Sequence, residues 1–166
     1  MRIRRLVALF VVLAMSLMLA ACSTSDKGPD GYVNWQGMND EYHHTIASFP
    51  YSLPPGVAFP ADAPAESPDD YTSWYGVGLG ELQAYEFAEC AYHSIVVANE
   101  TTDFEAAMKA LDSAEEIHNA PFNETYPHIV IGPSWQSVID KARLGDFSAF
   151  NDIYQTDCVG GWMGFK

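Results

Sequence analysis

The chain has 166 residues, of which 22 are acidic and eight are basic, and its formal net charge is −14. Such a surface repels nucleic acid and anionic phospholipid, so we expect no nucleic-acid partner. The aromatic content (nine Phe, nine Tyr and four Trp) is enough for one folded core and argues against a disordered chain.

The first 21 residues have the pattern of a secretory signal peptide. Three arginines within the first five residues precede an apolar run from Leu6 to Leu19, and no acidic residue occurs before Asp26. The apolar run is shorter than the about 20 residues that a membrane-spanning helix needs. The segment by itself also fits an ordinary signal peptide cleaved after Ala21 or an uncleaved membrane anchor.

The signal segment ends in Leu19-Ala20-Ala21-Cys22, which resembles the lipobox of bacterial lipoproteins. The resemblance covers residues 1–22 and concerns location only. It implies that residues 1–21 are removed, that Cys22 carries a diacylglyceryl group, and that the mature chain is extracytoplasmic and lipid-anchored to the cell membrane. The chain from Cys22 onward retains all 22 acidic residues and five basic ones, a formal charge of −17.

The two remaining cysteines, Cys90 and Cys158, form an even pair in a compartment that permits disulfides. We therefore expect a Cys90–Cys158 disulfide. It would stabilise the fold by on the order of 4 kcal/mol in the chain-entropy model. The alternative is two free thiols, one of them a nucleophile, but the adjacent Glu89 and Asp157 disfavour a thiolate.

Breaker residues and apolar spacing divide the mature chain into three parts. Residues 22–31 are polar and form a tether. Residues 32–70 contain a short helix over 37–47 and a proline-rich extended arm, with a turn at residues 54–56 and a polar loop over 61–70. Residues 71–166 form the helical core domain. Its first part, residues 71–80, is a flexible glycine-rich segment that leads into the first helix, and we call it the glycine-rich approach.

Helical periodicity predicts four helices in the core domain. The first runs over 80–98, is apolar over much of its girth and carries Cys90. Thr102 and Glu105 form a capping box for a second helix that ends near Asn119. The others span residues 134–144 and 146–158, and residues 129–131 are a possible short strand. The expected fold is mainly α: a small helical bundle with an extended Pro-rich N-terminal arm and one disulfide.

The best candidate metal site combines carboxylates and imidazoles from two of these helices. Its members are Glu86, Glu89, His93, Glu115 and His118. An ExxH pair such as Glu115 and His118 occurs on each of two helices in di-iron bundles, whereas this chain has one. The alternative is that these residues are charges on the solvent-facing side of the helices. No other cofactor is indicated.

No pattern of a catalytic nucleophile stands out, so we assign no catalytic residue. There is no Gly-x-Ser-x-Gly elbow, and a disulfide would remove the one close Cys–His pair, Cys90 and His93. The aromatic stretch Tyr71–Tyr75 either closes the core or stacks on sugars of the cell wall. We expect a non-enzymatic binding or interaction module with an envelope-protein or cell-wall partner; the alternative is a metal-binding helical protein or metalloenzyme.

Overall fold

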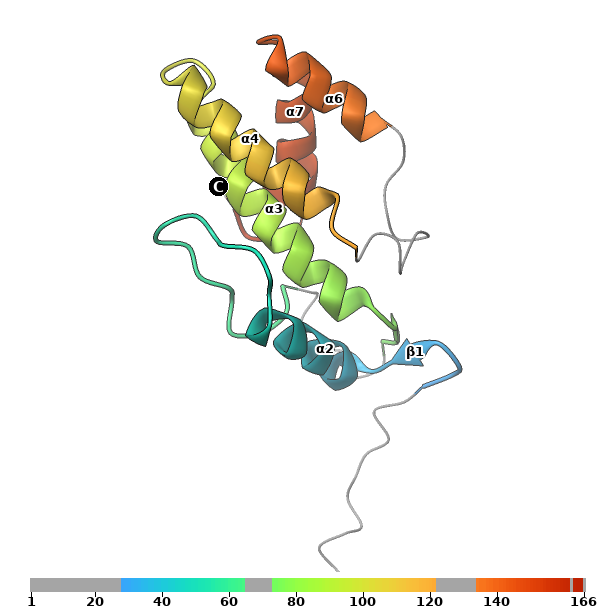
Figure 1. Ribbon diagram of the computed structural model, residues 1–166. Coiled ribbons are helices and arrows are strands. Elements are labelled where there is room, and N and C mark those ends of the chain that lie inside the picture. Colours follow the sequence, from blue (N-terminus) through green and yellow to red (C-terminus); the bar gives the residue numbers. More distant parts are fainter. Residues whose placement is uncertain (1–27, 65–72, 122–133, 162, 166) are drawn as a thin grey trace, which may run out of the picture.

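The computed structural model describes residues 28–64, 73–121, 134–161 and 163–165. It is mainly helical, as the sequence predicts (Figure 1). In chain order the elements are β1 (Tyr32–Val33), α2 (Trp35–Ala47), β2 (Tyr75–Gly76), α3 (Leu79–Asn99), α4 (Phe104–His118), α6 (Ser134–Arg143), α7 (Ser148–Ile153) and the π-helix η2 (Tyr154–Val159). None of the helices within these ranges combines the length and apolar character needed to cross a membrane.

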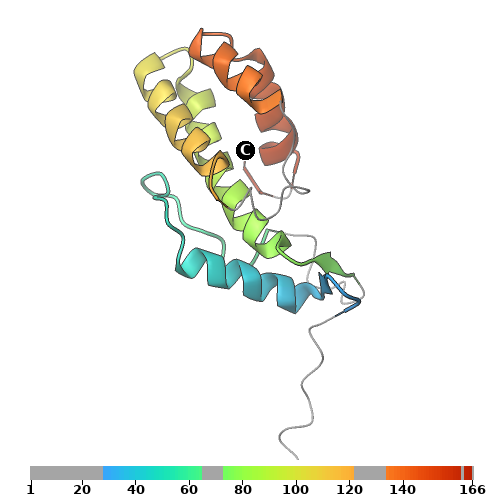
Figure 2. The ribbon, with the colours of Figure 1, turned by 45° about the vertical axis from the view of Figure 1, so that its right-hand side comes forward.

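Helix α3 is the central element of the bundle, as its broad apolar surface predicts. Helix α4 returns alongside it, and α6 and α7 cover the end where α3 meets α4 (Figures 1 and 2). The main core cluster joins these elements through Val96, Leu111, Ile139 and Phe150, each at most 1% exposed.

The other end of α3 rests on α2. Gly80 makes this close crossing possible, because a Cβ at that position would overlap the backbone carbonyl oxygen of Met38. Glu41 of α2 also caps α3: one of its carboxylate oxygens accepts hydrogen bonds from the backbone N–H groups of Gly78 (3.0 Å) and Gly80 (3.2 Å). A carboxylate at a helix N-terminus satisfies otherwise unpaired N–H groups and complements the helix dipole.

The proline-rich arm packs its aromatic residues onto the bundle, as the sequence predicts. The ring of Phe49 lies 5.1 Å from that of Phe59 and 5.1 Å from that of Tyr85 on α3. The expected turn is present, since the Val57 N–H donates to the Pro54 carbonyl at 3.0 Å. Gly56 has a φ of 84° there, a conformation that glycine adopts without steric cost.

Cys90 of α3 and Cys158 of η2 form the expected disulfide, with their Cα atoms 5.5 Å apart. The last helix differs from the prediction. The α-helix ends at Ile153 and the chain continues as a π-helix, in which the Gly160 N–H donates to the Gln155 carbonyl at 2.8 Å. A π-helix has more residues per turn than an α-helix, so the side chains along it point in different directions from those that α-helical spacing predicts. Cys158, which pairs with Cys90, lies on this π-helical segment.

Two local predictions are wrong. The cap of α4 is Asp103, whose carboxylate accepts from the Ala106 N–H at 3.0 Å, whereas the hydroxyl of Thr102 donates to the Ala98 carbonyl. A carboxylate is a stronger acceptor than a hydroxyl and also favours the positive helix end. The glycine-rich approach contains β2, which the sequence did not indicate. The possible strand at 129–131 lies outside the described residues.

Candidate functional site

Helix α3 carries four of the chemically interesting side chains on one side. Glu86, Glu89, Cys90 and His93 follow one another at steps of three, one and three residues, which keeps them on neighbouring rows of the helix surface. Helix α4 brings His118 to the same region, because the two helices form a hairpin. Trp135 of α6 and Cys158 of η2 complete this cluster, which we call the α3 cluster.

The Glu89 carboxylate and the His118 imidazole contact each other in the α3 cluster. The Glu89 Oε1 lies 3.2 Å from the His118 Nδ1, and the side chains are 19% and 22% exposed. Burial raises the pKa of Glu89, although the hydrogen bond from His118 acts in the opposite direction. The His118 ring packs on Trp135 with ring centroids 4.8 Å apart. The His118 ring is therefore held by the Glu89 carboxylate and by the Trp135 indole.

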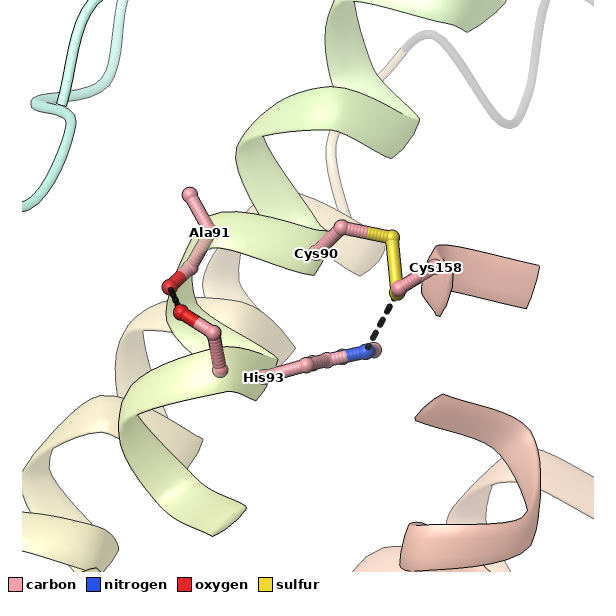
Figure 3. Close-up of a disulfide and its surroundings, with 5 residues drawn as sticks. Cys90, Ala91, His93 and Cys158 are labelled. Atoms are coloured by element: carbon pink, nitrogen blue, oxygen red, sulfur yellow. Dashed lines mark hydrogen bonds between the residues drawn. A yellow bond between two sulfur atoms is a disulfide. The ribbon is translucent and has the colours of Figure 1, made fainter. Parts of the chain in front are cut away.

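His93 lies deeper and contacts the disulfide (Figure 3). It is 3% exposed, and its Nδ1 is 3.8 Å from the Cys158 Sγ. Burial, and secondarily the neighbouring His118, lowers the pKa of His93 to about 3. The imidazole is therefore neutral at physiological pH. Its Nε2 is buried without a hydrogen-bond partner, which is uncommon for a buried polar atom.

Of the other two predicted metal ligands, Glu115 has a partner outside the Glu89–His118 pair, and Glu86 lies near Glu89. The carboxylate of Glu115 accepts a hydrogen bond from the Arg143 guanidinium at 2.6 Å, and Arg143 also donates to Asp112 at 2.6 Å. Burial raises the pKa of Glu86 to about 7, and the neighbouring Glu89 and Asp157 add to the shift. Glu86 thus lies near the pair as a weakly acidic carboxyl group.

Within the described ranges, the only set of three or more potential ligand atoms at metal-binding separations comprises Cys90, His93 and Cys158, all within 4.8 Å. The structure thus divides the five predicted ligands into three groups. Glu89 contacts His118 with Glu86 nearby, His93 lies at the disulfide, and Glu115 binds Arg143. The sequence signal for the cysteine–histidine set is the Cys90-x-x-His93 spacing of about one helical turn.

A separate cleft lies between the proline-rich arm and the α3–α4 pair. Its volume is about 280 Å³, and it is lined by Pro50, Tyr51, Ser52, Tyr92, Ser113, Glu116 and Ile117. The Tyr92 hydroxyl donates to the Ser52 carbonyl at 2.9 Å, which fixes the arm to α3. This volume is just below the usual range of small-molecule pockets. The sequence did not predict the cleft, because its lining comes from three segments distant in the chain.

No protein-family model matches the chain, and neither a curated protein nor a solved structure matches it.

Proposed function

We propose that this protein is an extracytoplasmic lipoprotein whose helical domain is a non-enzymatic binding module, held to a membrane through Cys22. The lipobox-like sequence supports the anchor, and the buried Cys90–Cys158 disulfide supports an oxidising compartment, where such bonds persist. Both features concern location, so the binding role rests on the cleft.

The observation that carries the binding role is the composition of the cleft. The exposed lining is mainly polar, and it includes the carboxylate of Glu116 and the hydroxyl-bearing residues Ser113 and Tyr92. A carboxylate accepts hydrogen bonds from hydroxyl and amino groups, and hydroxyl groups both donate and accept them. The matching ligand is a small hydroxyl- or amine-bearing molecule, such as a saccharide or short peptide of the cell wall.

Two measurements test this proposal. Cys22→Ser should release the protein from the membrane fraction in the host, and equal retention of wild type and variant would contradict the anchor. For the cleft, the ¹⁵N-labelled domain is titrated with an N-acetylglucosamine disaccharide and with short peptides. Glu116→Gln should weaken the resulting shifts, whereas Glu105→Gln, an exposed change elsewhere on α4, should leave them unchanged. Shifts that are equal in both variants would refute binding at the cleft.

A second candidate function, metal binding, is favoured by the Cys90–His93–Cys158 set. In a tetrahedral zinc site, metal–ligand bonds of about 2.3 Å to sulfur and about 2.0 Å to nitrogen place these two atoms about 3.5 Å apart. The Sγ of Cys158 and the Nδ1 of His93 are already 3.8 Å apart. A neutral imidazole and two thiolates form a ligand set that thiophilic metals prefer. This chain offers that set once the disulfide is reduced.

The reduction step balances with a dithiol as reductant. The dithiol gives two electrons and two protons to the disulfide and becomes a disulfide itself, and the metal then displaces one proton from each of the two thiols. Co²⁺ added anaerobically to the reduced, reductant-free Cys22→Ser protein should produce the thiolate-to-cobalt absorption of a tetrahedral site. His93→Gln should weaken or shift these bands. A featureless spectrum from the folded, reduced protein would exclude the metal site.

A further inference from the structure

The short β-ribbon exposes two aromatic side chains on one of its faces. Tyr32 pairs with Gly76 and Val33 pairs with Tyr75 in antiparallel register. Val33 and Tyr75 pack on the α2 core around Met38 and Tyr42. Because successive strand residues point to opposite faces, Tyr32 and the residue before Tyr75, Trp74, lie on the outer face. Tyr32 is 50% exposed and Trp74 is 49% exposed.

The outer face is fixed in place by backbone contacts. The Gly28 N–H donates to the Tyr32 carbonyl at 3.1 Å, and the Val77 N–H donates to the Gly31 carbonyl at 3.0 Å. The ring of Trp74 covers Gly28, where a Cβ would overlap it. Tyr32 and Trp74 are therefore half-exposed side chains on an ordered surface, which we call the ribbon face.

The position of the ribbon face relates it to the proposed anchor. The strand β1, which carries Tyr32, lies at the end of the fold opposite α6 (Figures 1 and 2). Gly28, which packs under Trp74, follows Cys22 by six residues. Six residues span at most about 20 Å. A lipid group on Cys22 thus keeps the ribbon face within one short tether of the bilayer surface.

We infer that the ribbon face seats in the lipid interface of the membrane that holds Cys22; this inference rests on the proposed lipid anchor. Tryptophan and tyrosine are the side chains enriched at membrane–water interfaces, where one part of the ring is in apolar surroundings and its polar group stays hydrated. The acidic surface opposes adsorption on anionic lipid, so the aromatic rings and the tether provide the attraction. The seated domain directs its α6 end away from the membrane.

The experiment uses purified, mass-verified lipidated protein in phosphatidylcholine vesicles with brominated acyl chains, which quench the fluorescence of tryptophan in the interface. Wild type should be quenched, and Trp74→Phe should lose most of the bromine-dependent change. Trp135→Phe is the matched control, because Trp135 packs against His93 and His118 in the α3 cluster; this variant should keep the change. Tyr32→Ser leaves Trp74 in place and should reduce its quenching at least twofold.

The outcomes separate this inference from the anchor. Vesicle-bound lipidated protein with no bromine-dependent quenching would refute the seated ribbon face and leave the lipid anchor intact. Equal quenching in wild type and Trp74→Phe would also refute it, since another tryptophan would then lie at the interface. Failure of the anchor itself is seen independently, as the absence of lipid on Cys22 by mass spectrometry. Thermal unfolding of each variant confirms that it is folded.

Discussion

Removing the Cys90–Cys158 disulfide should cost the domain a large part of its stability. The bond joins residues 68 apart in sequence. In the chain-entropy model, opening a loop of this length raises the entropy of the unfolded chain enough to reduce the free energy of unfolding by about 4 kcal/mol. Domains typically have about 5–15 kcal/mol in total. The melting temperature should therefore fall by roughly 10–20 °C.

The assay is urea unfolding of the Cys22→Ser protein, followed by circular dichroism, with and without the additional changes Cys90→Ala and Cys158→Ala. Alanine avoids burying an unpaired hydroxyl, since both positions are at most 4% exposed. Cys90→Ala alone is the control and should match the double variant within about 1 kcal/mol, because either change removes the bond. A loss below about 1 kcal/mol in the double variant would refute the entropic reasoning.

Three further changes test the packing and the charges. Glu86→Gln should stabilise the protein by roughly 1–3 kcal/mol above pH 7 and give no gain below pH 4.5. The reason is that the pKa of Glu86 is raised to about 7, so the ionised carboxylate is unfavourable in the folded state. A gain in urea titrations that does not depend on pH would contradict this. Glu41→Ala removes the cap of α3 and should cost about 1–2 kcal/mol in chemical unfolding, whereas an unchanged midpoint would show that water replaces the carboxylate. Gly80→Ala should lower the melting temperature through a cost of about 1–3 kcal/mol, because its methyl group overlaps the Met38 carbonyl; a stabilised variant would show that α2 can move away.

The helices could be predicted because each has a local cause. Apolar residues at helical spacing predicted a helix over 80–98, and α3 runs from Leu79 to Asn99. Prolines in residues 48–60 excluded a helix there, and aromatic alternation predicted that the arm packs on the domain, as it does. The disulfide followed from counting cysteines, and its geometry in the structure agrees with that count.

The candidate site was less predictable because it depends on rotation about helix axes. Glu115 and His118 lie one turn apart on α4, yet Glu115 pairs with Arg143 and His118 pairs with Glu89. Spacing places two residues on one side of a helix, but the partner of each depends on which neighbouring helix reaches it. His93 is a further case, because its contact with Cys158 requires the π-helical segment.

The sequence by itself determined the features that depend on nearby residues: helical periods, proline-directed extension, the signal-like segment and the acidic surface charge. Apart from the disulfide, tertiary structure alone decided the long-range pairings. The partners of the β1–β2 ribbon lie more than 40 residues apart, and the cap of α3 comes from Glu41 on another helix. The physical reason is that two-residue strands and side-chain caps leave no periodic trace in sequence, since packing selects them after the helices have docked.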